Sequence, residues 1–417
     1  MSAEDQVRDS IDHLFRHRAG QMVSVLVRKF GVTNIELIED AVQDAMISAM
    51  KTWPYSGPPI NQTAWLIQTA KNRAIDHLRR SAKSESIDGY DFEIRKELRD
   101  ETRFESELTE DQIRMIFACC NPSIPADSRV ALTLKIVGGF SVGEIARAYL
   151  AKDDAIAKML TRAKQKLRTL DLEFPAGAEL NERLDSVLRV LYLMFNEGYS
   201  ASEGSDLIRR DLCEEAVRLT RILLGHPLTS LPAVHALAAL FMFQSARFAT
   251  RTDAAGDLLL LADQDRSQWD RGMLAGGLDH FRMAASGSEL TDYHIEAEIA
   301  SLHALAPDYC STNWERIIAG YDTLLARRFS PVVALNRLVA VGEFRGGEAA
   351  LVELSALASN YMMTSFNLFH VTRAHFLAKL GRYGESIASY ARAAELTKND
   401  AVLRFIRRKI EMLESYE

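Results

Sequence analysis

The segment from Lys71 to Lys83 decides how this chain is interpreted, and its sequence is KNRAIDHLRRSAK. It carries five basic residues and one acidic residue, and the aromatic residue Trp65 lies just before it. Apolar residues recur at helical spacing through this region, at Leu66, Ile67, Ala70, Ala74, Ile75 and Leu78. The pattern predicts an amphipathic helix with a basic outer face. Such a face suits DNA that is single-stranded or melting, because cations hold phosphates and flat rings stack on bases. A face that is merely solvated is the alternative.

A second element begins 47 residues after Lys83, with an apolar helix predicted over residues 130–137. Gly138-Gly139 interrupts this helix. Ser141 can then cap a helix over residues 142–150, because Glu144 stands three residues later and completes a capping box. A short turn is predicted at Ala151-Lys152.

The next predicted helix begins at a cap formed by Asp153 or Asp154 and runs through Arg168. It is strongly basic after its first turn, with cations at Lys158, Arg162, Lys164, Lys166 and Arg168. A short helix, a tight turn and a basic helix form the helix-turn-helix pattern, whose second helix enters the major groove of DNA. Its first half then lies near base edges and its second half on phosphates.

The charges are unevenly distributed, although the whole chain has a formal net charge of −7. Residues 1–83 hold 11 basic and 9 acidic residues, and residues 112–170 hold 10 basic and 4 acidic residues. Between them, residues 84–111 hold 4 basic and 11 acidic residues. We therefore expect two DNA-binding modules joined by an acidic linker that is flexible and self-repelling.

The order of these motifs resembles that of the extracytoplasmic-function sigma factors, the group IV members of the sigma-70 type of bacterial RNA polymerase subunit. Residues 38–53 are similar to the family's helix that docks on the clamp of the polymerase β′ subunit. Residues 65–80 resemble its helix that opens and contacts the −10 promoter element. Residues 141–168 resemble its −35-binding domain, although many members carry Arg at the place of Met159 and Thr at the place of Ala155.

The resemblance implies roles for particular residues. Contacts with core RNA polymerase, which would include its β′ clamp and its β flap, are expected from Glu39, Asp40, Gln43 and Asp44. Contacts with the −10 element of promoter DNA are expected from Trp65, Lys71, Asn72, Arg73, Asp76, Arg79, Arg80 and Lys83. Contacts with the −35 element are expected from Lys152, Asp154, Ala155, Lys158, Arg162, Lys164 and Lys166.

The chain continues for 247 residues after residue 170, and its composition there is helical throughout. Helices are expected over residues 184–195, 212–224, 232–249 and 253–265, the first of them ended by Gly198. Near the end of the chain, packing residues follow the pattern of tetratricopeptide helix pairs, at Ala374, Leu377, Gly381, Tyr383, Tyr390 and Ala393. A looser copy is predicted 39 residues earlier, with residues 341–344 in the place of residues 380–383.

This C-terminal part resembles the extension found in one sub-group of these sigma factors, and residues 191–199 are similar to the sub-group's signature. The resemblance implies regulation in cis, with a protein or peptide partner on the concave side of the repeats. We expect Asn196, Glu197, Gly198 and Tyr199 to help join the extension to the DNA-binding modules. Their alternative role is helix capping and core packing.

Other kinds of site find little support in the sequence. The four cysteines, Cys119, Cys120, Cys213 and Cys310, form no C-x-x-C motif, which predicts buried thiols in a reducing cytoplasm. No apolar run is long enough to span a membrane, so we expect no membrane contact. We also expect no metal, no cofactor and no catalytic residues, since neither a phosphate loop nor a nucleophile with a base is apparent.

Together these observations predict an all-α protein with five parts. Residues 1–83 form a region 2-like domain, 84–111 the acidic linker, 112–170 a region 4-like helix-turn-helix domain, 171–289 a helical extension and 290–417 the tetratricopeptide-like repeats. The predicted function is that of a sigma factor, which is not an enzyme. The alternative is a helix-turn-helix regulator that binds operators without polymerase, and an enzyme in the C-terminal half is the third class considered.

Overall fold

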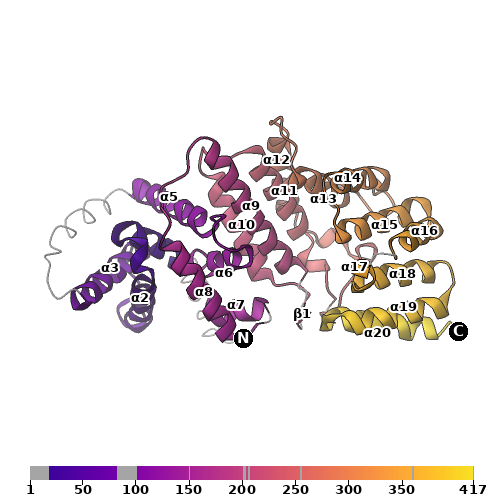
Figure 1. Cartoon of the computed structure of the whole chain (residues 1–417), viewed down its shortest axis with the longest axis horizontal. Coiled ribbons are helices and arrows are strands. Elements are labelled where there is room, and N and C mark those ends of the chain that lie inside the picture. Colours follow the sequence, from indigo (N-terminus) through magenta and orange to yellow (C-terminus); the bar gives the residue numbers. More distant parts are fainter. Residues whose placement is uncertain are drawn as a thin grey trace. The chain divides into compact units, whose positions relative to one another are not determined.

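A computed structural model describes residues 18–81, 101–149, 151–200, 203–204, 207–253, 256–358 and 361–416. Helices make up most of these residues, and the one sheet found among them is a parallel pair of short strands, β1 (Glu203–Gly204) and β2 (Lys398–Asn399). The all-α prediction is therefore confirmed (Figure 1). The chain divides into two compact units, residues 1–193 and residues 194–417.

The first unit begins with a helical segment over residues 18–30, followed by the 3-10 turn η1 (Val32–Asn34) and the helices α2 (Ile35–Ser56) and α3 (Gln62–Ser81). Helices α2 and α3 pack against each other. Their apolar residues are buried at the helical spacing of the sequence, Ile38, Ala41, Val42 and Ala45 on α2 and Leu66, Ile67, Ala70 and Ala74 on α3. The predicted amphipathic helix is therefore confirmed.

Helix α5 (Glu101–Cys119) corrects the prediction of a flexible linker, because residues 101–111 are helical. Leu108, Met115 and Ile116 are buried on it at a spacing of seven and one residues, which is one helix face. Asp111 is also buried and receives hydrogen bonds from Arg28 and Arg114. A high density of acids concealed this apolar stripe in the sequence. The rest of the predicted linker, residues 84–100, lies outside the described residues.

Three helices follow where the sequence predicted them, α6 (Ala126–Ile136), α7 (Val142–Tyr149) and α8 (Asp153–Leu167), with α8 packed on both others. The capping box forms, since the Ser141 amide donates to Glu144 Oε2 at 2.8 Å and the Glu144 amide donates to Ser141 Oγ at 3.2 Å. The predicted cap of α8 is wrong, because Lys152 occupies the N-cap and Asp153 and Asp154 lie in the first turn. There their charges still complement the helix dipole.

Helix α9 (Ala178–Tyr199) starts in the first unit and ends in the second. Its first part is tied to the first unit by polar contacts: Arg129 Nη1 donates to Ser186 Oγ at 2.7 Å, and Arg183 Nη2 donates to the carbonyl of Phe117 at 3.2 Å. Gly198, predicted to end the helix, lies inside it and has a different role that is described below.

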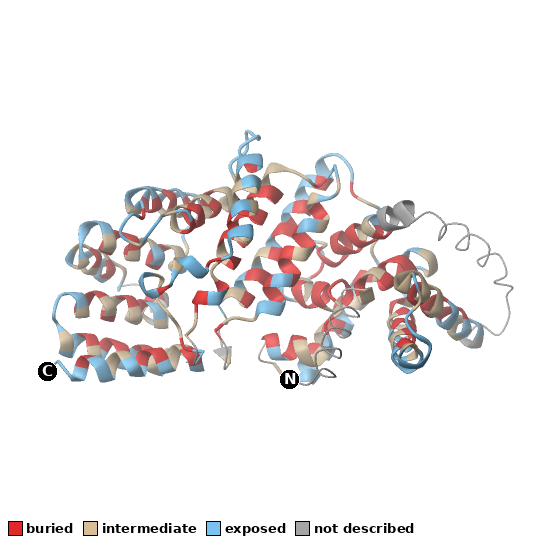
Figure 2. Ribbon diagram, turned by 180° about the vertical axis from the view of Figure 1, so that it is seen from behind, coloured by how far each residue is buried: buried red, intermediate tan, exposed pale blue. Residues whose placement is uncertain are grey.

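The second unit continues with α10 (Arg210–Leu224), α11 (Pro232–Ser245), α12 (Arg271–Ala284), α13 (Asp292–Ala304) and α14 (Trp314–Arg327). It ends with α15 (Pro331–Arg345), α16 (Gly347–Leu357), α17 (Tyr361–Thr364), α18 (Asn367–Lys379), α19 (Tyr383–Leu396) and α20 (Asp400–Glu414). Buried residues gather on the inner sides of these helices (Figure 2). Helix α11 is buried nearly all round and packs against α10, α12 and α13, as expected for a helix that is apolar on every side.

The helix predicted over residues 253–265 is absent. An isolated antiparallel bridge joins Thr252 to Leu258, and 3-10 turns follow as η4 (Leu261–Asp263) and η5 (Arg266–Gln268), after η3 (Phe248–Thr250). Gly256 has a φ of +79°, which glycine adopts readily and which is incompatible with a continuing right-handed helix. The side chain of Asp253 accepts from the amide of Asp257 at 2.9 Å and stabilises this turn instead.

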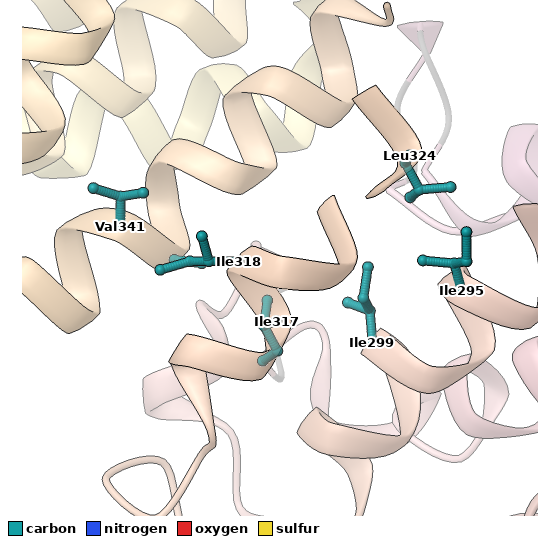
Figure 3. Packing of buried hydrophobic residues seen from close by; sticks show 7 residues of the cluster. Ile295, Ile299, Ile317, Ile318, Leu324 and Val341 are labelled. Atoms are coloured by element: carbon teal, nitrogen blue, oxygen red, sulfur yellow. The ribbon is translucent and has the colours of Figure 1, made fainter. Parts of the chain in front are cut away.

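Consecutive helices from α13 to α16 and from α18 to α20 pack against one another, as in helical-repeat proteins. One shared core joins α13, α14 and α15 through Ile295, Ile299, Ile317, Ile318, Leu324 and Val341 (Figure 3). In the pair α18 and α19, the predicted packing residues Ala374, Tyr390 and Ala393 are buried. Ser386, which stands where alanine is usual, is buried too, and its Oγ donates to the carbonyl of Ala374 at 2.7 Å.

The earlier repeat copy was aligned incorrectly. Gly342 was matched to Gly381, but Gly342 lies inside α15, where a Cβ would come within 2.1 Å of the Phe376 ring. The turn glycine is Gly346, with a φ of +94°, and it corresponds to Gly381, with a φ of +74°. These two glycines are 35 residues apart rather than the 39 predicted for the copies.

The C-terminal helix α20 and the strand β2 before it contact residues near the start of the second unit. Strand β2 pairs with β1, and Arg404 Nε on α20 donates to Asp257 Oδ1 at 2.5 Å. Arg408 Nη1 lies 3.1 Å from Asp253 Oδ2. Leu258 and Leu260 pack against the core of α18 to α20. These contacts join the first and last parts of the compact unit that runs from Met194 onward.

Candidate functional site

The residues expected to contact polymerase form one face of α2. Asp40, Gln43 and Asp44 are exposed, and they lie on the same side of the helix because they are three and four residues apart. The sequence analysis overlooked that Ile47 and Met50 extend this face, with 41% and 48% of their surface exposed. An acidic face that continues into exposed apolar residues is suited to docking on another protein.

The residues expected to contact the −10 element form the outer face of α3. Asn72, Arg73, Asp76 and Arg79 are exposed at spacings of one, three and three residues, opposite the buried face that packs on α2. Gln68 Nε2 donates to Asn72 Oδ1 at 2.9 Å, which orients that side chain. His77 Nε2 lies 3.8 Å from Asp44 Oδ2, so the outer faces of α2 and α3 adjoin.

Two members of the predicted −10 set are placed differently from the expectation. Lys71 is buried, with 1% of its surface exposed, so it is not part of the exposed outer face of α3. Lys71 lies on the side of α3 that carries the buried residues Ala70 and Ala74, and this position buries its side chain although it is basic. Trp65 is partly buried and packs edge-to-face on Trp53, with ring centroids 5.6 Å apart. The side chain of Arg80 and all of Lys83 lie outside the described residues.

The residues expected to contact the −35 element lie mostly on the exposed face of α8. Ala155, Lys158, Arg162 and Lys166 are exposed and follow one another at spacings of three and four residues. Lys152 and Asp154 are exposed at the start of the helix. The buried side of α8 carries Ile156, Leu160, Ala163 and Leu167. The outward face is therefore basic along two turns and is available for a polyanion.

Lys164 is the exception, because it joins a residue of the predicted polymerase-binding set. Its Nζ lies 2.5 Å from Glu39 Oε2, and Lys135 Nζ of α6 lies 3.7 Å from Glu39 Oε1. The side chains of Glu39 and Lys164 are only 16% and 13% exposed. The structure thus brings together one residue of the predicted polymerase face and one of the predicted DNA face.

A second ion pair beside this one was missed by the sequence analysis. Arg168, just after α8, donates from Nη2 to Glu36 Oε2 in the first turn of α2. Burial alone would raise the pKa of Glu36, but the hydrogen bond and charge of Arg168 outweigh it and lower this pKa. The sequence did contain a signal for this pair. Glu36 and Glu39 are three residues apart and Lys164 and Arg168 are four apart, so the two acids share one helix face and the two bases share another.

The residues expected to join the extension to the DNA-binding modules make their described contacts within the second unit. Glu197 Oε1 pairs with Arg209 Nη1 at 2.9 Å, and Asn196 is exposed. Tyr199 stacks on Phe195, with ring centroids 5.8 Å apart, and the Arg251 guanidinium lies over the Tyr199 ring at 3.7 Å from its centroid. These contacts match the alternative role of helix capping and core packing.

Gly198 explains why α9 and α10 can cross closely. A Cβ at this position would lie 2.7 Å from Cys213 Sγ and 2.8 Å from the carbonyl of Arg209. The amide of Arg209 also donates to the carbonyl of Gly198 at 2.7 Å. Only a residue without a side chain fits here, so Gly198 permits packing rather than ending the helix.

The sequence analysis also made predictions about the cysteines, metal sites and membrane spans. Cys119, Cys120 and Cys213 are buried as expected, and burial raises the pKa of Cys120 to about 12. Cys310 is exposed, contrary to the expectation. In the described ranges, no cluster of three or more His, Cys, Asp or Glu side chains is arranged to hold a metal ion. No helix in those ranges has the length and apolar character needed to cross a membrane.

Comparison with known proteins adds independent information. Residues 14–84 match Sigma-70 region 2, which covers α2 and α3. Residues 183–285 match a family of unknown function (DUF6596), which runs from within α9 to the end of α12. An uncharacterised protein of Rhizobium meliloti (strain 1021) is 38% identical over 404 residues, covering 94% of this chain and 93% of that protein. No solved structure matches the chain.

Proposed function

We propose that this chain is an extracytoplasmic-function sigma factor, a transcription initiation factor of the sigma-70 type whose partners are core RNA polymerase and promoter DNA. The observation that carries the proposal is the pair of outer faces on α2 and α3. Asp40, Gln43 and Asp44 form an acidic face, and Asn72, Arg73, Asp76 and Arg79 form a polar and basic one. Both lie inside the matched region.

We assign the acidic face of α2 to core polymerase and the outer face of α3 to the −10 element. Asn72, Arg73 and Asp76 would contact bases of the opened strand, and Arg79 would hold phosphates. Promoter opening would then be driven by binding free energy, because captured bases offset the stacking that they lose, at a few kcal/mol per base. Polymerase performs the synthesis, so the chain itself needs no catalytic residue.

We assign the exposed face of α8 to the −35 element. Lys158 lies in the first half of the helix, the part that contacts base edges in the major groove, and Arg162 follows on the same face one turn later. Lys166 lies nearer its end and would contact phosphates. Ala155 offers only a methyl group, so its contribution would be apolar contact with thymine.

The second unit is assigned a regulatory role in cis. The 35-residue spacing of Gly346 and Gly381 is close to the 34-residue period of tetratricopeptide repeats, which supports that description of α15 to α20. Such arrays bind peptides or proteins on one face, and a partner of this kind would supply the signal. The proposal also places the protein in the cytoplasm, where polymerase acts.

The decisive experiment is in vitro transcription with core RNA polymerase on a promoter library, with and without the full chain. Specific initiation should depend on the chain. Asn72→Ala combined with Arg73→Ala should reduce it by at least about tenfold, since each lost contact is worth about 1–3 kcal/mol. Arg189→Ala, which removes an exposed arginine of α9, is the matched control and should leave initiation unchanged.

The second candidate is an operator-binding regulator that uses α8 without polymerase, and the exposed basic face of α8 favours it as well. Binding of promoter duplex by the isolated protein separates the two functions. Tight, sequence-specific duplex binding together with no polymerase-dependent initiation would establish the regulator and exclude the sigma factor.

A further inference from the structure

Two arginines of the second unit lie against the same tryptophan. The guanidinium carbon of Arg266 is 4.7 Å from the centroid of the Trp269 ring, and that of Arg247 is 5.6 Å from it. Arg247 lies between α11 and η3, whereas Arg266 begins η5 and Trp269 follows that turn. Trp269 is buried, and its Nε1 donates to Thr250 Oγ1 at 2.9 Å, which fixes the ring. Two cations are therefore held beside one aromatic ring.

These two cations are not balanced by carboxylates. In the part of the chain that the structure describes, neither Arg247 nor Arg266 forms an ion pair. Arg247 Nε donates to the side-chain oxygen of Gln264 at 3.2 Å, and Arg266 Nη1 donates to the carbonyls of His303 and Ala306. All three acceptors are neutral groups, so they satisfy hydrogen bonds without supplying a negative charge.

The acid whose charge acts on Arg266 is Asp308, and it is engaged elsewhere. Asp308 is exposed, and its Oδ1 accepts from both the amide and the hydroxyl of Ser311 at 2.8 Å. An exposed carboxylate is screened by water, so it offsets little of the positive charge on Arg266.

A third arginine adds positive charge to the same region. Arg251 is buried, and it contacts the Tyr199 ring and donates to the Tyr199 carbonyl. Burial lowers the pKa of both Arg251 and Arg266, and the charge of Arg247 lowers both further. The three guanidiniums therefore repel one another in a poorly hydrated place, which raises the free energy of the folded chain until a negative charge arrives.

Polar atoms without a hydrogen-bond partner lie in the same part of the unit. Arg266 Nη2, His303 Nδ1 and Thr312 Oγ1 are buried and bond to none of the described residues. His303 is near the end of α13, and Thr312 is in the loop before α14, which also carries the Ala306 carbonyl that Arg266 contacts. Buried polar groups of native proteins are nearly always hydrogen-bonded. Water could bond to such groups, but only an anion would also balance the arginines.

We propose that Arg247, Arg266 and Thr312 bind a small ligand that carries a phosphate or carboxylate group. We call these three residues, with Trp269 and His303, the arginine site. Guanidinium groups bind such oxyanions through paired N–H donors, and the Nη atoms of Arg247 and Nη2 of Arg266 are not used by the described residues. The site lies wholly in the second unit, so it does not depend on the roles proposed for α2, α3 and α8.

Thermal unfolding of the full chain tests the arginine site. Differential scanning fluorimetry would be performed with added sodium phosphate or sodium acetate, and with sodium chloride at matched ionic strength to account for general screening. An anion that binds the folded chain raises its melting temperature as its concentration passes the Kd. We expect a saturable rise with at least one of the two anions beyond that given by chloride. A larger rise with phosphate would identify a phosphate-bearing ligand, and a larger rise with acetate a carboxylate-bearing one.

Arg247→Gln separates a binding role from a structural role. The glutamine keeps an amide donor for Gln264 and removes one of the repelling charges. Without added anion, the variant should therefore melt at the same temperature as the wild type or higher. With the anion, the concentration that gives half of the maximal shift should rise at least about tenfold, because one charge-assisted contact is lost.

Thr312→Val is a second variant that leaves all charges in place. It removes a buried hydroxyl that has no partner among the described residues, so the stability without anion should not fall. Its response to the anion should be weaker than that of the wild type. Arg328→Gln is the matched control, because Arg328 is an exposed arginine of the same unit, at the end of α14, and it should respond as the wild type does.

Two results would overturn the arginine site. One is a wild-type protein that neither phosphate nor acetate stabilises beyond chloride, with Arg247→Gln melting at a lower temperature, since Arg247 would then be a structural residue. The other is an equal anion response in the wild type, Arg247→Gln and Thr312→Val, since the anions would then act elsewhere. Neither result depends on transcription, so the site and the proposed function can fail separately.

Discussion

Two arginines of the second unit donate hydrogen bonds to carbonyls at helix ends. Arg266 Nη1 donates to the carbonyls of His303 and Ala306 at 2.7 and 2.8 Å, at the end of α13. Arg251 Nη1 donates to the carbonyl of Tyr199 at the end of α9. Helix C-termini carry partial negative charge, so these carbonyls stabilise the buried Arg251 and the partly buried Arg266. Burial lowers the pKa of Arg251 from its ordinary value, and the neighbouring Arg247 contributes to this.

His303 gives a prediction at the same scale. Burial, followed by the charges of Arg247 and Arg266, lowers its pKa to about 3, and its buried Nδ1 has no hydrogen-bond partner. The folded chain therefore keeps this imidazole neutral, whereas the unfolded chain protonates it below its ordinary pKa of 6.5. Since the unfolded state binds more protons between those values, stability is complete above about pH 6.5 and is lost as the pH falls.

The wild-type protein should lose about 1.4 kcal/mol from this one group between about pH 7.5 and about pH 5.5. His303→Gln should remove that part of the pH dependence. Urea denaturation of both proteins at the two pH values measures it, and any packing change common to both pH values cancels in the difference. Parallel losses in the two proteins would show that His303 is not buried in this way.

At the scale of elements, the crossing of α9 and α10 depends on Gly198. The sequence suggested a helix end, because glycine often follows the last turn of a helix. In the structure, glycine is required at this position because Cys213 and the Arg209 carbonyl occupy the space that a side chain would need. Phe195, one turn earlier, stacks on Phe241 of α11 with ring centroids 4.1 Å apart. The end of α9 is thus packed between two helices of its own unit.

Gly198→Ala should therefore destabilise the second unit by about 1–3 kcal/mol, the usual cost of overpacking a tight contact. Chemical denaturation followed by circular dichroism measures the change. Gly225→Ala is the control, because a Cβ there would have its nearest neighbours at ordinary contact distances of 3.5 and 3.6 Å. Equal stabilities for the two variants would contradict the close crossing.

At the scale of the whole molecule, the two units have different functions in our proposal and can be separated by truncation. A cut near residue 172, just past the predicted end of the helix-turn-helix domain at residue 170, would remove Arg183 and Ser186, which bond to the rest of the first unit. The boundary after Leu193 keeps these contacts. The chain ending at Leu193 is therefore the appropriate truncation.

We expect the chain of residues 1–193 to melt at a higher temperature than the chain of residues 1–172, because it retains the α9 contacts. If the second unit regulates in cis, residues 1–193 should also transcribe the same promoters at a rate at least about threefold different from the full chain, a change of about 0.7 kcal/mol. Differential scanning fluorimetry and in vitro transcription measure the two effects. Equal rates and promoter choice would remove the regulatory proposal.

The sequence by itself determined the local features of this protein. Its helical periodicity located α2, α3 and α6 to α8, the Ser141–Glu144 capping box was apparent from two residues, and Lys158 and Arg162 fall on the exposed face of α8. These features depend on neighbours within one or two turns, and such neighbours can be identified from spacing alone. The Sigma-70 region 2 resemblance rested on the same local patterns.

Only the tertiary structure decided which side chains are exposed to a partner and which are buried or paired within the protein. Lys71 is buried, Glu39 is paired with Lys164 from 125 residues away, and Gly198 packs against Cys213. The tertiary structure also identified Gly346 as the turn glycine of the earlier repeat, and it showed that the acid-rich residues 101–111 are part of helix α5. Each outcome depends on a partner distant in the chain. Spacing shows which face of a helix a residue lies on, but burial and ion pairing are set by what packs against that face.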